Sequence, residues 1–580
     1  MVTKTPKFDK ALDEIFKTLI PHEKVCFECK ISFKVEKEDI DFYKMLKVPP
    51  PTLCPRCRQI RRLGILMRVP KFFKRPCNAP GHSENVITVF PPSSLHKVYD
   101  NNYWYSDSWE AELYGRDYNL NGKFFDQFRD LFFAVPHMPL ERDVTSINSE
   151  YSLGGRHGKN NYYTAGAYHS EDCSFGEEVR FSKFCLDCLN VWDSEFCYEC
   201  AVVDHCHRCI FTVDSEQCMD SAFLYDCKNC TNCFLSSNLR NKSYVFENKQ
   251  LSKDEYKSNM AGLNLGDRTV LWNMRKRFDD ILKDALRRSI WLTNATGCLG
   301  DRLVNCKNCF QTFDGIEGEN LRYVQSFDRA KDAMDSSYYA GDGSNLLYES
   351  AVSAGSGSIF FSLYIRACIN IEYCSECNNC QNCFGCVGLK NKKFCIFNKQ
   401  YSEDNYWKTV DEIKSKMLGD KEYGELFPLA LGLFPYQTSR SQKFYPINEK
   451  IATEKGIPWY NELDSQAAQN IQLKDPNKDV PADIKDVDSS ILKDAIRCEI
   501  TGRPFKIVEH ELKFYKHMNL PIPTKHPWQR LMERAVFMHP LELFPFACPS
   551  CGEKSLSIYN EEKQKQFKIF CEKCYVKEIV

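Results

Sequence analysis

The chain has no apolar run long enough to cross a bilayer, and Met1–Lys10 carries lysines without an apolar stretch and a small-residue cleavage site. We therefore expect a cytoplasmic protein, in a compartment where thiols stay reduced. The formal net charge is only −1, so bulk charge indicates no class of partner. The chain also lacks a nucleotide-binding glycine loop, a nucleophile elbow and a zincin helix. No catalytic residue is assigned, and we lean against an enzyme.

Cysteine, by contrast, is abundant, with 31 residues in a chain of 580. A chain of this length exceeds one hydrophobic core, so we expect several structural units. In a reducing compartment the expected roles of cysteine are metal binding and burial as a thiol, whereas a disulfide scaffold would require export.

Two sets of four cysteines lie at the ends of the chain. They are Cys26, Cys29, Cys54 and Cys57, and Cys548, Cys551, Cys571 and Cys574. Paired C-x2-C spacing is typical of a structural zinc ribbon. Four thiolates fill a tetrahedral shell and leave no position for an activated water, so we expect two structural zinc ions per chain and no catalysis at either.

The two ends are copies of one double-ribbon module. An ungapped alignment of Cys26 with Cys498 also aligns Arg58 and Arg62 with Arg530 and Arg534, and a small shift then aligns Cys77 with Cys548. Each copy has lost one site. The remnants are Cys77 with Pro80, Asp100 and Tyr103, and Cys498 with Thr501, His526 and Gln529. We expect both remnants to be empty, because so few ligands rarely hold a structural zinc ion.

The central cysteines are periodic. Cys185, Cys206 and Cys227 recur at every twenty-first position, and a fixed period near twenty predicts stacked coils. Short aromatic strands between polar turns favour a parallel β-helix. The region is duplicated at an offset of 150, since Asn248-Lys249-Gln250 recurs as Asn398-Lys399-Gln400. Between the copies, an apolar stripe predicts a helix over Arg268–Trp291 that covers strand edges.

The expected fold class is mostly β with flanking helices: a central stacked β-solenoid in two duplicated halves, with a zinc-ribbon module at each end. The expected boundaries are 1–115 for the N-terminal module, 116–171 for an aromatic connector, 172–256 and 297–400 for the solenoid halves, 257–296 for a helical insertion, 401–490 for a helix and linker, and 491–580 for the C-terminal module.

Two residue sets in the solenoid admit two interpretations each. Cys185, Cys188, Cys206 and Cys209 have a spacing that fits a further zinc ion, or they are stacked buried thiols that need no metal. Asp193, Asp214 and Asp314 each follow an aligned cysteine at the fifth position. They could form a carboxylate row for a cation or for acid–base work on a polysaccharide, or they are solvated turn residues.

Four short sequence motifs resemble those of a protein family. They are P-P-P-T-L-C-P-R-C-R at 49–58, N-C-F-G-C-V-G-L-K-N-K-K-F at 382–394, F-N-K-Q-Y-S at 397–402 and F-P-L-A-L-G-L-F-P-Y at 427–436. The chain is similar over nearly its full length to large Cys-rich proteins with terminal zinc ribbons in predicted proteomes of small-genome uncultured bacteria. The resemblance implies the architecture above, and it implies no catalytic residue because that family has no established activity.

Basic residues are dense beside the first cysteine set, with eight between Arg56 and Arg75, among them Arg68. Arg56, Arg58, Arg61 and Arg62 are candidate nucleic-acid contacts, and a solvated basic helix is the alternative. The predicted function is a zinc-binding, non-enzymatic scaffold for RNA or the ribosome. A protein-binding scaffold is the first alternative, and a polysaccharide-acting β-helix enzyme is the second. Neither a membrane nor a small-molecule substrate is expected as a partner.

Overall fold

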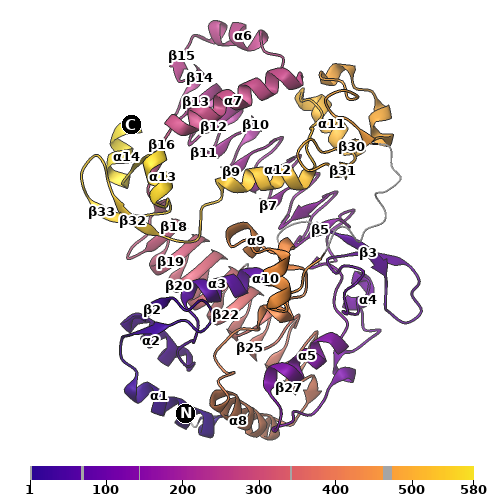
Figure 1. Cartoon of the computed structure of the whole chain (residues 1–580), viewed down its shortest axis with the longest axis vertical. Helices are drawn as coiled ribbons and strands as arrows, with labels where there is room; N and C mark the ends of the chain where they lie inside the picture. The colour runs from indigo at the N-terminus through magenta and orange to yellow at the C-terminus, as the bar shows by residue number, and fades with distance from the viewer. Residues whose placement is uncertain (1–2, 67–70, 143, 340–342, 461–472, 580) are drawn as a thin grey trace. The chain divides into compact units, whose positions relative to one another are not determined.

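The structure is a computed structural model that describes residues 3–66, 71–142, 144–339, 343–460 and 473–579 (Figure 1). The chain forms two compact units. Unit 1 contains residues 1–67, 73–139 and 290–460, and unit 2 contains residues 68–72, 140–289 and 461–580. Each unit thus combines one end of the chain with one part of its centre.

Unit 2 is built on an 11-stranded sheet. Its strands are β5 (Ser152–Leu153), β6 (Thr164–Ala165), β7 (Glu177–Arg180), β8 (Leu189–Trp192), β9 (Ala201–Asp204), β10 (His207–Ile210), β11 (Val213–Glu216), β12 (Met219–Tyr225), β13 (Thr231–Ser237), β14 (Ser243–Phe246) and β15 (Lys249–Gln250). Except at the antiparallel β15, the pairing is parallel and advances by twelve positions: Glu177 lies opposite Leu189, which lies opposite Ala201. The expected coil of twenty-one residues is therefore wrong. The pairing already begins at Arg142, within the segment expected to be a connector.

Unit 1 contains a 12-stranded sheet of the same kind. Its strands are β17 (Leu292–Thr293), β18 (Leu299–Val304), β19 (Lys307–Ile316), β20 (Glu319–Asp328), β21 (Ala330–Tyr339), β22 (Ser344–Ala354), β23 (Gly357–Phe360), β24 (Leu363–Arg366), β25 (Ile369–Glu372), β26 (Gln381–Phe384), β27 (Lys393–Ile396) and β28 (Lys399–Gln400). Cys309 lies opposite Leu321, again twelve positions on, whereas Ala333 lies opposite Leu347, fourteen positions on. Large parallel sheets with flanking helices agree with the predicted fold class.

The backbone explains the advance of twelve positions. A residue with positive φ recurs at every third position, as at Phe181, Phe184 and Asp187. A residue with left-handed backbone conformation turns the chain, so each straight segment is about three residues long. Four such segments bring the chain back beside the residue twelve positions earlier. Buried side chains recur at the same interval, from Cys185 to Cys188.

The same geometry explains why the cysteine spacing misled. Cys185 and Cys206 are twenty-one positions apart, a multiple of three but not of twelve, so both are buried without lying opposite each other. The residue twelve positions after Cys185 is Cys197. The residues that follow these two cysteines, Leu186 and Tyr198, lie opposite each other in a parallel bridge. Cysteine therefore marks the buried position of each short segment rather than the length of a coil.

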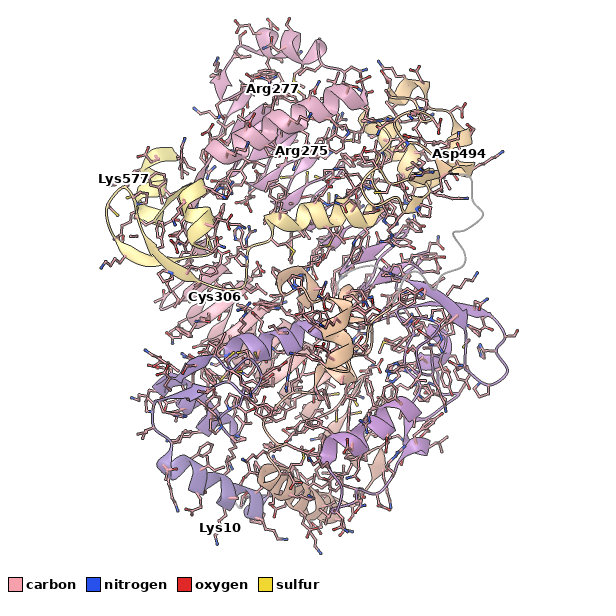
Figure 2. All side chains as sticks on the ribbon, viewed as in Figure 1. Lys10, Arg275, Arg277, Cys306, Asp494 and Lys577 are labelled. Carbon is pink, nitrogen blue, oxygen red and sulfur yellow. The ribbon has the colours of Figure 1, made fainter. Side chains whose placement is uncertain are left out.

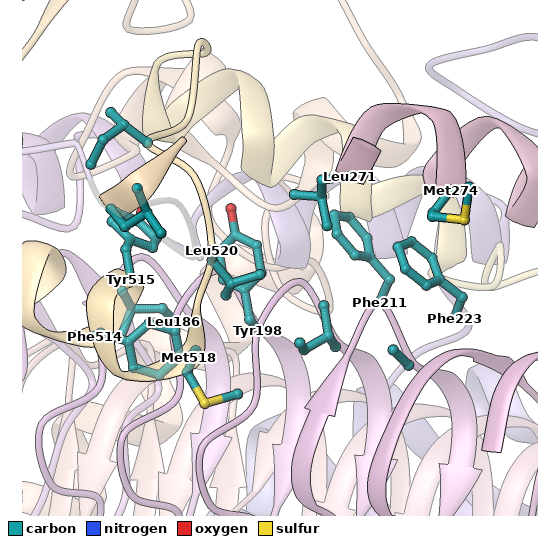
Figure 3. Packing of buried hydrophobic residues seen from close by; sticks show 14 of the residues in the cluster. Leu186, Tyr198, Phe211, Phe223, Leu271, Met274, Phe514, Tyr515, Met518 and Leu520 are labelled. Carbon is teal, nitrogen blue, oxygen red and sulfur yellow. The ribbon is translucent and has the colours of Figure 1, made fainter. Parts of the chain in front are cut away.

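Helices cover one face of the unit 2 sheet. They are α6 (Lys253–Ala261), α7 (Arg268–Asp284), α11 (Glu509–Met518) and α12 (Pro527–Arg534). The helix predicted over Arg268–Trp291 is confirmed only as far as Asp284, where α7 ends, and β16 (Leu286–Arg288) takes up part of the rest. The buried Leu271 and Met274 of α7 pack in one cluster with Phe211 and Phe223 (Figure 3). Arg275 of the same helix (Figure 2) lies over the Phe211 ring, 5.2 Å from its centroid.

The remaining elements of unit 2 belong mainly to its C-terminal module. They are β16 (Leu286–Arg288), β29 (Leu473–Lys474), β30 (Ala495–Arg497), β31 (Pro504–Phe505), β32 (Phe544–Ala547), β33 (Lys554–Ser557), α13 (Glu561–Gln566), β34 (Lys568–Phe570) and α14 (Glu572–Ile579). β16 pairs in parallel with β34, which ties the module to the chain that leaves α7.

The remaining elements of unit 1 surround its sheet. They are α1 (Pro6–Thr18), β1 (His22–Val25), β2 (Ser32–Val35), α2 (Lys37–Leu46), α3 (Pro55–Gly64), β3 (Phe73–Pro76), β4 (Asn85–Thr88), α4 (Asn101–Tyr105), α5 (Phe124–Ala134), α8 (Glu403–Gly419), α9 (Ser441–Phe444) and α10 (Glu449–Glu454). Phe128 of α5 stacks on Phe427 with ring centroids 4.5 Å apart. Within the described ranges, no helix has the length and apolarity needed to span a bilayer.

Candidate functional site

The first four-cysteine site lies in unit 1, where Cys26 follows β1 and Cys54 caps the N-terminus of α3. The ligand atoms of Cys26, Cys29, Cys54 and Cys57 lie within 4.8 Å of one another. The Cys54 amide donates to Cys26 Sγ at 3.3 Å, and the Cys57 amide donates to Cys54 Sγ at 3.5 Å. The hairpin and the helix start therefore direct four sulfur atoms to one point.

The second four-cysteine site lies in unit 2, between the β32–β33 hairpin and the start of α14. Its ligand atoms, from Cys548, Cys551, Cys571 and Cys574, also lie within 4.8 Å of one another. Gly552, with φ of 74°, closes the turn, and the Cys571 amide donates to Cys548 Sγ at 3.5 Å. Tyr575 is fully buried beside this site, and its hydroxyl hydrogen-bonds to Asp226 of the sheet.

Both sites fit a tetrahedral ion with four thiolate ligands. With metal–sulfur bonds of about 2.3 Å, the edge of a tetrahedron is about 3.8 Å. The Cys29–Cys54 and Cys551–Cys571 sulfur pairs are 3.7 Å apart, which is also far longer than a disulfide bond. The two sites are geometrically suited to zinc, as the sequence predicted.

In each site, local hydrogen bonds lower the pKa of one thiol, whereas the pKa values of Cys57 and Cys571 are raised. The pKa of Cys54 is lowered to about 5, first by a hydrogen bond from the Cys57 thiol and then by the Cys57 amide, while burial acts in the opposite direction. Burial also acts to raise the pKa of Cys548, but the amides of Cys571, Cys551 and Ser550 outweigh it and lower the pKa to about 6. Thiolates are the form in which cysteine binds a metal ion.

The central cysteines form no such cluster. Among the described residues, no group of three or more ligands within 4.8 Å includes Cys185, Cys188, Cys206 or Cys209. Their thiols instead face backbone carbonyls: Cys185 Sγ donates to the oxygens of Lys183 at 3.3 Å and Ser194 at 3.6 Å. The interpretation as buried thiols fits this geometry, and a further zinc site does not.

Of the two interpretations of Asp193, Asp214 and Asp314, the carboxylate row does not fit the structure. Asp193 and Asp214 are twenty-one positions apart, so they do not lie opposite each other in a sheet that advances by twelve. Asp193 is exposed and pairs with His205 Nε2 at 3.0 Å, and Asp314 belongs to the other unit. A paired-carboxylate mechanism therefore has no basis in the placement of these residues.

Two of the four candidate nucleic-acid contacts are buried. Arg58 and Arg62 lie on α3 with side chains that are 1% exposed, and both form ion pairs with Asp335 and Glu349 of the unit 1 sheet. Their expected role as phosphate contacts is wrong, because a guanidinium enclosed by protein carboxylates cannot reach a phosphate. Arg68 lies outside the described residues.

The other two arginines of this group differ from each other. Arg61 is 19% exposed and pairs with Glu28 and Glu425, at 3.6 and 4.0 Å. Arg56 is exposed and lies over the Tyr445 ring, with its guanidinium carbon 5.3 Å from the centroid. Local sequence shows the density of charge but not the acids that neutralise it from distant segments.

Unit 2 repeats the buried arginine arrangement. Arg530 and Arg534 on α12 contact Asp187, and Arg534 Nη1 is also 2.8 Å from Glu199. The Arg534 and Asp187 side chains are 2% and 0% exposed. In each unit, two arginines one helical turn apart on a single helix form ion pairs with two acids. The acids are Asp335 and Glu349 in unit 1 and Asp187 and Glu199 in unit 2. The aligned arginines were the only sequence signal for this contact.

The residues of the expected C-terminal remnant, Cys498, Thr501, His526 and Gln529, form hydrogen bonds with residues nearby in the chain. Cys498 Sγ accepts a hydrogen bond from the Thr501 amide at 3.5 Å, His526 Nδ1 accepts one from the Trp528 amide at 3.0 Å, and Gln529 donates to Glu533. His526 thus serves as the N-cap of α12, where unit 1 has a cysteine ligand.

A cavity of about 380 Å³ opens beside this remnant in unit 2. Its wall is aromatic and basic, with no carboxylate. The lining residues are Lys71, Phe72, Tyr162, Tyr163, Phe175, Arg503, Pro504, Phe505, Lys506, Val508, His526, Pro527, Trp528 and Leu531. Sequence reasoning missed this site, since its residues come from five separate stretches of the chain.

At the expected N-terminal remnant, Cys77 lies close to ligands other than the predicted Pro80, Asp100 and Tyr103 positions. Cys77, His82 and Glu84 have ligand atoms within 4.8 Å of one another. His82 and Glu84 were not predicted, because they do not align with any cysteine of the intact copy.

In comparisons with known proteins, the chain matches no defined protein family and no protein of curated function.

Proposed function

We propose that the protein is a zinc-stabilised, non-enzymatic scaffold of the cytoplasm, with one zinc ion in each four-cysteine site. All 31 cysteines lie in the described part of the chain and carry free thiols, which supports a reducing compartment. The recurrent pairing at twelve positions supports two β-solenoid halves that arose by duplication. The protein would then be related to the large Cys-rich proteins with terminal zinc ribbons that its sequence resembles.

The proposed partner is RNA, alone or in the ribosome, and the cavity of unit 2 is the observation that carries this choice. Single-stranded nucleic acid is bound by aromatic side chains that stack on bases and by cations that lie along the backbone. The cavity offers both: the rings of Tyr163 and Trp528 beside the charges of Arg503 and Lys506.

The cavity combines positive charge at its rim with an apolar floor. Lys506 is exposed, Arg503 is partly exposed, and both lie on the short segment that includes β31. Phe175 and Phe505 are 5% and 7% exposed, so the floor is apolar. A nucleotide base would cover this floor while its phosphate remained near the rim.

The test is binding of a fluorescent single-stranded RNA to the zinc-loaded full chain, followed by anisotropy from about 50 to 200 mM salt. Each phosphate contact on a single strand contributes about 0.7 to the slope of log affinity against log salt. The Arg503→Ala/Lys506→Ala variant should weaken binding and reduce the slope by about 1.4. Trp528→Ala should weaken binding by about 1–3 kcal/mol without changing the slope, because stacking releases no counterion.

The matched control is Lys253→Ala/Lys257→Ala, which removes the same charge from the exposed side of α6 in the same unit. It should leave both affinity and slope unchanged. If the wild-type protein shows no salt-sensitive RNA binding, or if both double variants weaken it equally, the RNA proposal fails and a protein-binding scaffold replaces it.

A further inference from the structure

The β3–β4 hairpin of unit 1 brings three different ligand types together outside the four-cysteine sites. Cys77 is buried, whereas the side chains of His82 and Glu84 are 28% and 52% exposed. One sulfur, one nitrogen and one oxygen lie within 4.8 Å of one another. His82 Nδ1 also hydrogen-bonds directly to the Glu84 carboxylate.

The hairpin keeps the backbone of an intact ribbon. The Cys77 amide donates to the Glu84 carbonyl at 3.0 Å, just as the Cys548 amide donates to the Glu553 carbonyl at 2.9 Å. Gly81 has φ of 79°, close to the 74° of Gly552. The turn is a metal-binding knuckle in form, although the second cysteine has become Pro80.

The turn is two residues longer than its counterpart, and the additional length supplies the new ligands. The last strand pair before the turn is Pro76–Asn85 in unit 1 and Ala547–Lys554 in unit 2. His82 lies within the longer turn, and Glu84 ends it. Loss of the cysteines was therefore accompanied by a change that directs imidazole and carboxylate groups toward the remaining sulfur.

The sulfur of Cys77 has the hydrogen bonds of a metal-bound thiolate. It accepts from the amides of Ala79 at 3.5 Å and Asp100 at 3.2 Å. The second of these matches the bond from the Cys571 amide to Cys548 Sγ in the intact site. Amide donors stabilise a thiolate whether or not all of its former partners remain.

The other two former ligand positions support the site without joining it. The Asp100 carboxylate caps α4 by accepting the amide of Asn102 at 2.9 Å, so it is committed to the helix. The Tyr103 ring occupies the position aligned with Cys574 and contacts the His82 ring edge to face, with centroids 4.8 Å apart. Tyr103 thereby limits the orientations of the imidazole.

We propose that Cys77, His82 and Glu84 bind a third zinc ion, with a water molecule in the fourth position. Thiolate, imidazole and carboxylate together suit zinc, whereas calcium and magnesium prefer oxygen ligands alone. Three protein ligands with one open position distinguish this site from the two closed four-cysteine sites. Binding uses the Cys77 sulfur as a thiolate and so releases a thiol proton, and the metal takes the place of the hydrogen bond between His82 and Glu84.

Zinc content of the purified full chain tests the proposal, measured after dialysis against excess zinc and again after brief treatment with a weak chelator. The wild type should hold three zinc ions and lose one to the chelator, because the open site is accessible to solvent. His82→Ala/Glu84→Ala should hold two and lose none. The matched control, His539→Ala/Glu542→Ala, changes the same residue types in unit 2 and should hold three.

Cobalt substitution gives an independent readout. The wild-type minus His82→Ala/Glu84→Ala difference spectrum should contain one thiolate-to-cobalt band that is weaker than the bands of the four-cysteine sites, and Cys77→Ser should abolish it. A wild type that never exceeds two zinc ions would overturn the proposal. So would a third ion that persists in the His82→Ala/Glu84→Ala variant. Neither result depends on RNA binding.

Discussion

Arg534 shows how a single residue joins a module to a sheet in unit 2. Replacing it with Met leaves the buried Asp187 with Arg530 as its arginine partner and breaks the ion pair between Glu199 and Arg534. Breaking a buried pair from one side costs about 3–5 kcal/mol, because the remaining charge is uncompensated. We expect Arg534→Met to lower the free energy of unfolding of unit 2 by this amount, as measured by urea denaturation.

Two further variants separate charge from packing in this prediction. Arg534→Met/Glu199→Met should recover part of the loss, since it also removes the uncompensated carboxylate. Lys565→Met breaks an exposed pair with Glu561 and should have no measurable effect. Equal destabilisation by Arg534→Met and Lys565→Met would show that the buried pair has no special role.

Glu511 gives unit 2 a pH dependence. Burial raises its pKa from an ordinary 4.5 to about 7, while Arg530 and the Val508 amide act to lower it. Asp187, which also faces this group, acts to raise it. Between these two pKa values the folded chain holds a proton that the unfolded chain has released, so the free energy of unfolding decreases as pH rises.

The comparison with Glu511→Gln isolates this effect. From about pH 5 to pH 8, the free energy of unfolding of the wild type should fall by about 2–3 kcal/mol relative to that of the variant. Other titrating groups, the zinc ligands included, are common to both proteins and cancel in the difference. Parallel stability curves would contradict the assigned pKa.

At the residue scale, the sequence predicted the metal ligands and failed for their neighbours. The C-x2-C pairs can be recognised as metal ligands from local sequence, because residues three positions apart must lie close together. Arg58 and Arg62 could not be interpreted in this way, since Asp335 is 277 residues from Arg58 along the chain and only the fold brings them together. His82 and Glu84 were missed because they take no aligned ligand position.

At the scale of elements, the cysteines reflect the narrow interior of each sheet segment. The buried positions at every third residue are often filled by small side chains, and Ser194 and Cys206 occupy equivalent positions in successive turns of the chain. Ser194 Oγ donates to the Trp192 carbonyl at 2.7 Å, and Cys206 Sγ donates to the Asp204 carbonyl at 3.5 Å. Both side chains thus donate to the backbone carbonyl two residues earlier in the chain. Sequence periodicity could show that the region was regular. It could not show which multiple of three is the number of residues in one coil.

Serine should therefore replace cysteine in this region without loss of metal. We expect a variant with four substitutions to fold and to keep its zinc content. The substitutions are Cys185→Ser, Cys188→Ser, Cys206→Ser and Cys209→Ser. By contrast, Cys197→Leu should destabilise unit 2 by about 1–3 kcal/mol, because added volume at a fully buried position forces its neighbours to shift. Loss of one zinc ion from the fourfold serine variant would restore the interpretation of these cysteines as metal ligands.

At the scale of the whole molecule, chain order does not predict which parts fold together. The boundaries expected from sequence follow one another along the chain, whereas the N-terminal module shares unit 1 with residues 290–460 and the C-terminal module shares unit 2 with residues 140–289. The composition of the segments gives no reason for either pairing. The choice is made by side-chain contacts such as Arg58 with Asp335, which become visible only in three dimensions.

The two units should respond differently when zinc is removed. In unit 1 the metal site includes Cys54 and Cys57 at the start of α3, the helix that carries Arg58 and Arg62. In unit 2 the metal site lies at α14, whereas α12 carries the arginines and is capped by His526 without a metal. A strong chelator should therefore release the arginines of unit 1 from their acids and leave those of unit 2 in place.

Hydrogen exchange on the chelated full chain would measure this asymmetry. Protection should fall in α3 and in the strands β21 and β22 that carry Asp335 and Glu349, because the helix loses the two cysteine anchors that fix its start. In unit 2 it should fall in β32–β34 and α14 but persist in α12 and around Asp187. Cys29→Ser should reproduce only the unit 1 pattern, and Cys574→Ser only the unit 2 pattern. Equal loss of protection in α3 and α12 would mean that zinc supports both units through general stability rather than through the helix that it anchors.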